Sequence, residues 1–158
     1  MPIWKRLESE FRSQHQTLFR IAMACTLDAA LAEDAVHDAL VSVARSQTMP
    51  QNLRGYVRRS VRNSALRLAT TRPVAAEPRD FFASEHLSPP ATALAQQVVR
   101  WLPELNEQHR EAIVLHLWGE LSFREIAEHM DVPLGTVTSW YQRGISHLQR
   151  RVQSDENV

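Results

Sequence analysis

The most constraining feature of the sequence is a pair of helical segments near its C-terminal end, separated by a short turn. The first segment begins at Ser122, and Glu125 three residues later completes the pattern of a capping box. The turn contains Asp131, which tolerates the left-handed conformation, and Pro133, whose fixed φ suits a helix start. Apolar residues recur at helical spacing over residues 134–152. This pattern predicts a helix-turn-helix.

The second of these helices presents polar and cationic side chains, and between residues 134 and 153 it carries arginines and no acidic residue. Base edges in the major groove are read by hydrogen-bond donors and acceptors on an exposed first turn of such a helix. The cap, the turn and the acid-free helix together favour DNA binding over an ordinary helical hairpin that packs on its neighbours. The outward-facing candidates are Thr136, Thr138, Ser139, Trp140, Gln142 and Arg143.

The rest of the chain is also predicted to be helical. Only 4 glycines occur in 158 residues, helix-favouring residues are abundant, and no Asn-Gly or Asp-Gly hairpin turn is present. The fold class is therefore all-α, and the length allows one ordinary domain or two small ones. Apolar periodicity places further helices at residues 7–25, 29–45, 53–69, 91–102 and 107–118.

A proline-rich stretch divides the chain. Residues 70–90 contain four prolines among Ala, Ser and acidic residues, with little periodicity, which is typical of a tether between domains. We therefore predict one helical domain at residues 5–70, a linker at 71–90 and a second helical domain at 91–153. The adjacent aromatics Phe81 and Phe82 are unusual in a linker and would suit docking on one of the domains.

Charge is unevenly distributed although the formal net charge is zero. Residues 21–44 carry four acids and no Lys or Arg, whereas residues 39–76 carry seven arginines and no acid. This polarity indicates one surface for a basic partner and another for phosphates. Arg54, Arg58 and Arg62 recur every four residues and so align on one helix flank. The alternative interpretation of both runs is a solvated helix face.

Several function classes are disfavoured. The chain has a single cysteine, Cys25, which excludes an internal disulfide and fits a reducing cytoplasm. Because Cys25 lies among apolar residues, we expect its thiol to be buried. The N-terminus lacks a secretion-signal pattern, and no apolar run is long enough to span a membrane. The sequence contains no HExxH, CxxC or phosphate-binding glycine loop. We expect no metal, no cofactor and no catalytic residue, and an enzyme is the least favoured alternative.

The C-terminal half resembles the DNA-binding domain of the sigma-70 family, specifically its extracytoplasmic-function (ECF) group. Residues 102–112 (LPELNEQHREA) resemble the opening of that domain. Residues 121–127 (LSFREIA) and 135–144 (GTVTSWYQRG) resemble its helix-turn-helix. The resemblance implies that this half is a region 4-like domain that reads the promoter −35 element. It adds Arg124 to the six outward-facing residues predicted to contact DNA there.

The N-terminal half resembles region 2 of the same family, a three-helix domain. Residues 32–39 (AEDAVHDA) resemble the helix that binds core RNA polymerase, and residues 53–63 (LRGYVRRSVRN) resemble the element for −10 recognition and strand opening. The implied polymerase-binding residues are Glu33, Asp34, Val36, His37, Asp38 and Leu40. The implied −10 contacts are Asn52, Arg54, Tyr56, Arg58, Arg59, Arg62 and Asn63.

The resemblance implies a cytoplasmic bacterial transcription factor that binds core RNA polymerase and both double-stranded and melted promoter DNA. An anti-sigma factor is a common further partner in the family, and no membrane insertion is expected. The sequence departs from the family pattern at Tyr56, where Trp is frequent, at Asp131, where Gly is frequent, and at Thr138, where a basic residue is frequent. A conventional helix-turn-helix regulator that never contacts polymerase is the main alternative, but it leaves the acidic and arginine-rich first half without a role.

Overall fold

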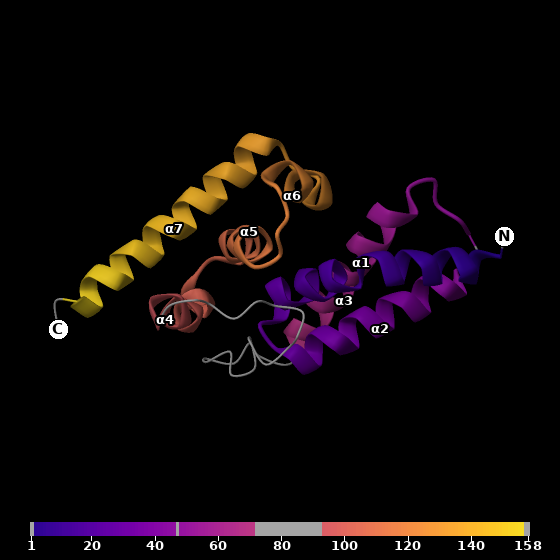
Figure 1. Cartoon of the computed structure of the whole chain (residues 1–158), viewed down its shortest axis with the longest axis horizontal. Helices are drawn as coiled ribbons and strands as arrows, with labels where there is room; N and C mark the ends of the chain where they lie inside the picture. Colours follow the sequence, from indigo (N-terminus) through magenta and orange to yellow (C-terminus); the bar gives the residue numbers. More distant parts are fainter. Residues whose placement is uncertain (1, 47, 72–92, 157–158) are drawn as a thin grey trace.

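The computed structural model describes residues 2–46, 48–71 and 93–156, and the side chains of residues 93–96 and 156 are excluded from the description. The described residues are helical, with no strand among them. Figure 1 shows two groups of helices, α1–α3 on one side and α4–α7 on the other, with the two chain ends at opposite extremes. This confirms the prediction of an all-α fold. Almost all of the predicted linker, with Phe81 and Phe82, lies outside the described residues.

The first group begins with the long helix α1 (Ile3–Thr26), which is kinked at Gln14, where φ is −129° and ψ is 24°. The helix ends at Leu27, which adopts a left-handed conformation. Asp28 then caps α2 (Ala29–Arg45) by accepting a hydrogen bond from the backbone of Leu31. The tight corner between Leu27 and Asp28 therefore sets α1 and α2 side by side.

Helix α3 (Leu53–Thr71) completes the three-helix group by packing against both α1 and α2. Its predicted apolar stripe is largely buried, with Leu53, Val57, Val61 and Ala65 in the core. Cys25 is also buried, as the apolar sequence around it predicted, and burial raises the pKa of its thiol well above the ordinary value.

The second group contains α4 (Ala93–Trp101), a 3₁₀ turn (Leu102–Glu104) and α5 (Glu107–Leu117). Asn106 caps α5 by accepting from the backbone of Gln108. Gly119 follows the helix end, but the left-handed residue in this connection is Glu120, with φ of 59°. Gly119 is needed for a different reason, because a Cβ there would lie 2.5 Å from the carbonyl oxygen of Leu115.

The helix-turn-helix is formed by α6 (Phe123–Met130) and α7 (Leu134–Glu156). Both hydrogen bonds of the predicted capping box are present between Ser122 and Glu125. Asp131 is left-handed, with φ of 54°, and its backbone amide closes the end of α6. The local geometry predicted from the sequence is therefore confirmed.

The two groups pack against each other, with α5 against α1 and α6 against α3. Their buried apolar residues belong to one continuous core, from Leu18 and Phe19 in α1 to Ile113 and Leu115 in α5. In Figure 1, α5 lies at the centre of the molecule next to α1, while α7 runs along the outside of the second group. The surfaces predicted to bind partners therefore belong to a molecule in which the two groups are in contact.

Candidate nucleic-acid and partner interfaces

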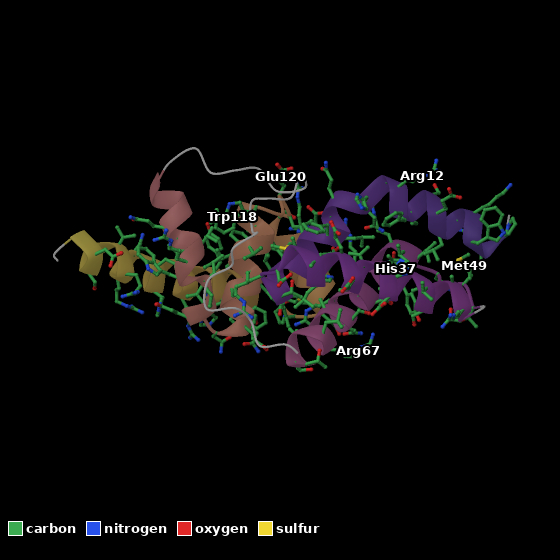
Figure 2. All side chains as sticks on the ribbon, turned by 90° about the horizontal axis from the view of Figure 1, so that it is seen from below. Arg12, His37, Met49, Arg67, Trp118 and Glu120 are labelled. Carbon is green, nitrogen blue, oxygen red and sulfur yellow. The ribbon has the colours of Figure 1, made fainter. Side chains whose placement is uncertain are left out.

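The acidic surface predicted to bind a basic partner lies on α2. Glu33, Asp34, His37 and Asp38 are exposed, whereas Val36 is buried and Leu40 is half-buried. His37 is labelled on α2 in Figure 2. A groove of about 270 Å³ separates this face from α1, and its lining residues are Phe11, His15, Phe19, Glu33, Val36, His37 and Leu40. The α2 face thus combines accessible anions with a partly apolar groove.

The arginine-rich surface on α3 divides into two parts. Arg54, Arg59 and Asn63 are exposed, and Tyr56 retains 36% of its surface exposed. Asn52 accepts a hydrogen bond from the backbone of Gly55 and so begins the helix. These residues are accessible to nucleic acid in the structure.

The other two arginines of the predicted row are half-buried and already have acidic or polar partners. Arg62 donates from Nε and Nη2 to the two carboxylate oxygens of Glu111 on α5, at 2.8 and 3.0 Å. Arg58 donates from Nε to Oε1 of Gln14 at 2.8 Å, and its Nη1 lies 3.9 Å from a carboxylate oxygen of Glu125 on α6. Donation of hydrogen bonds to Glu111 raises the pKa of Arg62, whereas burial, together with Arg54, lowers the pKa of Arg58.

A small cavity of about 110 Å³ lies where α6 covers α3. His129 on α6 lines it and is 6% exposed, and neither of its ring nitrogens has a hydrogen-bond partner among the described residues. Burial, together with nearby Arg62, Arg58 and Arg59, lowers the pKa of His129 to about 4. The imidazole is therefore neutral near pH 7.

The recognition-helix surface on α7 is more open. Gln142 and Arg143 are exposed, as is Arg124 on α6. The other four predicted residues, Thr136, Thr138, Ser139 and Trp140, are half-buried. Trp140 packs against the core, so much of its ring surface has a structural role. Ser139, Gln142 and Arg143 also line a polar cleft of about 640 Å³ between α7 and the start of α5.

The residues that join the two halves were not predicted from the sequence to have this role. They include Glu111, Glu125 and His129, and also Arg20 on α1, whose Nη1 lies 3.5 Å from the carbonyl oxygen of Gly119 and 3.7 Å from a carboxylate oxygen of Glu120. The only local indication was a charged pair, Arg110 and Glu111, directly before the apolar run of residues 112–115. Figure 2 labels Glu120 in the connection after α5.

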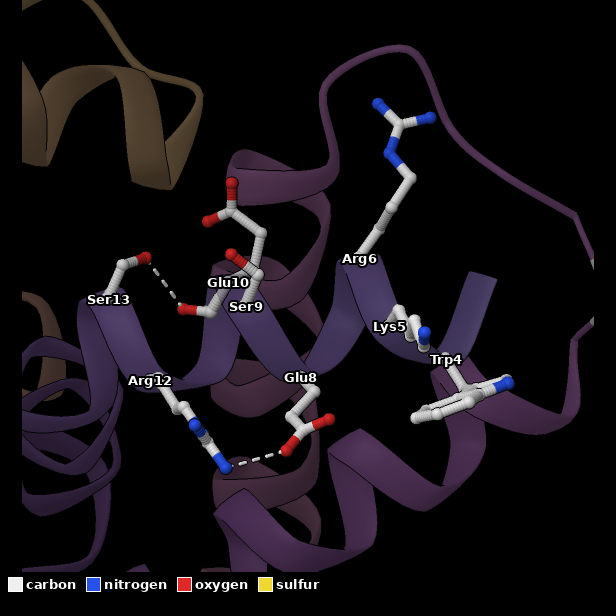
Figure 3. Close-up of a pocket in the computed structure, with 8 residues that line it drawn as sticks. All are labelled: Trp4, Lys5, Arg6, Glu8, Ser9, Glu10, Arg12 and Ser13. Carbon is white, nitrogen blue, oxygen red and sulfur yellow. Dashed lines mark hydrogen bonds and ion pairs between the residues drawn. The ribbon is translucent and has the colours of Figure 1, made fainter. Parts of the chain in front are cut away.

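A surface depression of about 840 Å³ runs along the N-terminal half of α1 (Figure 3). The residues that line it all come from this one helix, including exposed Trp4 and the ion pair between Arg12 and Glu8. None of the predicted partner-binding residues belongs to it.

The part of the chain that the structure describes contains no group of three or more His, Cys, Asp or Glu residues arranged to hold a metal ion. None of the described helices has the length and apolar character to cross a membrane. Nδ1 of His116 lies 2.9 Å from the carbonyl oxygen of Leu121, and its ring stacks on Phe123.

Comparison with known proteins finds a family similarity in the second half of the chain and a fold similarity over most of its length. Residues 95–148 match the family model described as sigma-70, region 4. The fold is similar to that of the sigma factor RpoE from Bartonella quintana, solved in complex with the anti-sigma factor NepR. That match has a TM-score of 0.63 and 23% sequence identity, and it covers 96% of this chain and 99% of that chain. No curated protein sequence matches the chain.

Proposed function

We propose that this chain, a member of the sigma-70 family, is an ECF-type sigma factor that binds core RNA polymerase and directs it to promoters. The observation that carries the proposal is the combination of a region 4 helix-turn-helix with an exposed acidic helix and an arginine-rich helix in one chain. A regulator that binds DNA alone needs the first of these elements but neither of the others. We further propose that the protein acts by binding, without catalysing a reaction, in the bacterial cytoplasm.

Polymerase binding is assigned to the acidic face of α2. Glu33, Asp34 and Asp38 would meet basic residues of the polymerase, and charge complementarity of this kind speeds and orients association. The groove beside the face would add apolar contact through Leu40, while buried Val36 would shape its floor. His37 lies on the same exposed face and would contribute a polar contact.

Promoter melting is assigned to the start of α3. Exposed Arg54 and Arg59 would bind phosphates near −10, with Asn52 and Asn63 at the edges of the same surface. Tyr56 is accessible and would stack on an unpaired base. Such stacking contributes about 1–3 kcal/mol, which is comparable with the few kcal/mol required to unstack a base. Arg58 and Arg62 would add phosphate contacts once they are released from the second half.

Recognition of the −35 element is assigned to the first turns of α7, together with Arg124. Gln142 and Arg143 would reach base edges or phosphates in the major groove, and the smaller Thr136, Thr138 and Ser139 would contact the backbone. Because the net charge of the whole chain is zero, DNA binding without polymerase is expected to be weak.

An anti-sigma factor is proposed as a further partner. The similar RpoE structure contains the anti-sigma factor NepR, which supports this assignment.

The direct test is a pull-down with purified core polymerase. The double charge reversal Glu33→Lys and Asp34→Lys should abolish binding, because it replaces two exposed anions on the proposed contact face with cations. The control reverses two exposed acids elsewhere, Glu8→Lys and Asp155→Lys, and should retain binding. Undiminished binding of the first variant would overturn the assignment and favour a DNA-binding regulator that acts alone. Run-off transcription with core polymerase on a randomised promoter pool then tests initiation itself.

A further inference from the structure

The cavity of about 110 Å³ between α3 and α6 is lined by the groups that a small oxyanion requires. We propose that this cavity binds inorganic phosphate, held by donors at the start of α3 and by His129 of α6, with two carboxylates selecting the protonated anion. A single buried water needs only about 10–15 Å³ of such space, so the cavity has room for an anion of this size. The site goes beyond the proposed function, because neither polymerase nor promoter DNA is needed to fill it.

His129 is the observation that points to a ligand. Its side chain lines the cavity and is 6% exposed, and no partner for either ring nitrogen occurs among the described residues. Burial of an unpaired polar group is unfavourable, so such groups in folded proteins usually have a partner. The imidazole is neutral near pH 7, and one of its ring nitrogens therefore carries a hydrogen and donates. An oxygen of a ligand in the cavity supplies the acceptor that the protein does not.

The other donors come from the start of α3, namely Asn52, Arg54, Arg58 and Arg59. The side-chain oxygen of Asn52 accepts from the backbone of Gly55, which leaves its Nδ2 as a donor. A Cβ on Gly55 would lie 2.7 Å from this Nδ2 and 3.2 Å from Nη1 of Arg59. The missing side chain therefore lets the two donors converge above the backbone. The positive end of the α3 dipole lies at the same place and favours an anion.

The lining also contains two carboxylates, Glu125 and Glu128 of α6. Carboxylates accept hydrogen bonds and repel a fully ionised anion, so they would exclude sulfate or a phosphodiester. Inorganic phosphate differs because it retains a hydrogen near pH 7 as HPO₄²⁻. Its P–OH group can donate to a carboxylate while its other oxygens accept from α3 and His129. A phosphate monoester loses its last proton at a pKa of about 6 and is therefore a poorer match.

The first experiment is isothermal titration calorimetry of the full chain with sodium phosphate at pH 7, in chloride buffer of constant ionic strength. Sodium sulfate and dimethyl phosphate should bind at least about tenfold more weakly, because neither can donate to the carboxylates. In parallel, phosphate at about five times its Kd should raise the midpoint of thermal unfolding by about 2–4 °C. Absence of binding, or equal binding of the three anions, overturns the proposal. Tighter binding of adenosine monophosphate than of phosphate would overturn the choice of the free anion.

The first variant removes the unpaired histidine. His129→Leu eliminates the buried donor, and an apolar side chain in place of an unpaired polar one is compatible with the fold. Phosphate binding should weaken by about tenfold, since one hydrogen bond to a charged ligand is lost. The matched control is His37→Leu, which removes an exposed histidine on α2 and should retain phosphate binding.

The second variant tests the site without altering any of its donors. In Gly55→Ala the added Cβ would displace the amide of Asn52 and the guanidinium of Arg59, so phosphate binding should weaken several-fold. Gly135→Ala is the control, because no atom lies within 4 Å of a Cβ added there. Both substitutions lie in helices, where Ala is favoured over Gly, so neither should unfold the chain. The proposal is overturned if His129→Leu and Gly55→Ala both bind phosphate as tightly as their controls.

The choice of anion is tested by the double variant Glu125→Gln with Glu128→Gln. Gln at position 125 can still complete the capping box that begins at Ser122. Its amide group donates as well as accepts, so sulfate should now bind and the preference for phosphate should fall about tenfold. An unchanged preference would overturn the role given to the carboxylates. The core-polymerase pull-down of the wild-type chain tests the proposed function separately.

Discussion

On α7, Gln142 and Arg143 are exposed in the isolated protein, whereas on α3 Arg58 and Arg62 are half-buried against the second half. Both surfaces were predicted from the sequence to contact DNA. The difference arises because α7 lies on the outside of its helix group, while α3 packs against α6 (Figure 1). A residue's suitability for phosphate binding therefore does not establish that it is available, since a carboxylate of the same chain can satisfy the same guanidinium.

The largest expected effect on stability comes from removing Arg62. Arg62→Ala leaves the buried carboxylate of Glu111 without its partner, and the free energy of unfolding should fall by about 3 kcal/mol. Arg54→Ala removes an exposed arginine of the same row and should change the free energy of unfolding by less than about 0.5 kcal/mol. Urea denaturation of both variants provides the measurement. Equal stabilities would show that Arg62 and Glu111 are not paired in solution.

A smaller effect is expected from the glycine that positions α6. In Gly119→Ala the new Cβ would lie 2.5 Å from the backbone oxygen of Leu115, so the connection must shift at a cost of about 1–3 kcal/mol. Gly135, at the open start of α7, has no atom within 4 Å of an added Cβ. Gly135→Ala should therefore be neutral or stabilising by up to about 1 kcal/mol. Thermal unfolding of the two variants tests whether the covered and open regions differ in this way.

The sequence predicted features that depend on near neighbours. The capping box of Ser122 and Glu125 and the left-handed Asp131 are local, because their partners lie within a few residues. The pairing of Arg62 with Glu111 joins residues 49 apart in the chain, and nothing in either helix alone specifies it. Helical periodicity indicated that α3 buries one face, but the choice of partner for its arginine flank depends on how the two groups pack. The partial burial of Arg58 and Arg62 could therefore not be predicted from the sequence alone.

Acidification should open the contact between the halves through His129. With the two halves in contact, burial and neighbouring arginines lower its pKa to about 4, whereas separation of the halves would return it toward 6.5. The separated halves then bind more protons, so the contact is fully favoured above pH 6.5 and loses stability as pH falls toward 4. The charged groups around the imidazole are Arg58, Arg59 and Arg62 on α3 and Glu125 and Glu128 on α6.

Each pH unit in that window should shift the equilibrium toward separated halves by up to about tenfold. The distance between spin labels attached through Ser42→Cys and Ser154→Cys, both exposed, provides the measurement when it is recorded as a function of pH. His129→Gln removes the titrating group and should flatten the profile. A profile unchanged by this substitution would assign the pH response to other groups.

The smallest expected effect on folding comes from the open surface, where Arg143→Gln should change the free energy of unfolding by less than about 0.5 kcal/mol. Its effect should appear in DNA binding, because loss of one phosphate-contacting cation lowers the salt slope of binding to duplex promoter DNA by about 1. Arg143 is exposed, so its cation is available to a phosphate. Arg62→Gln should reduce the slope less, because two donors of that guanidinium are already hydrogen-bonded to Glu111. Affinity titrations of both variants over a series of salt concentrations distinguish the exposed arginine from the half-buried one.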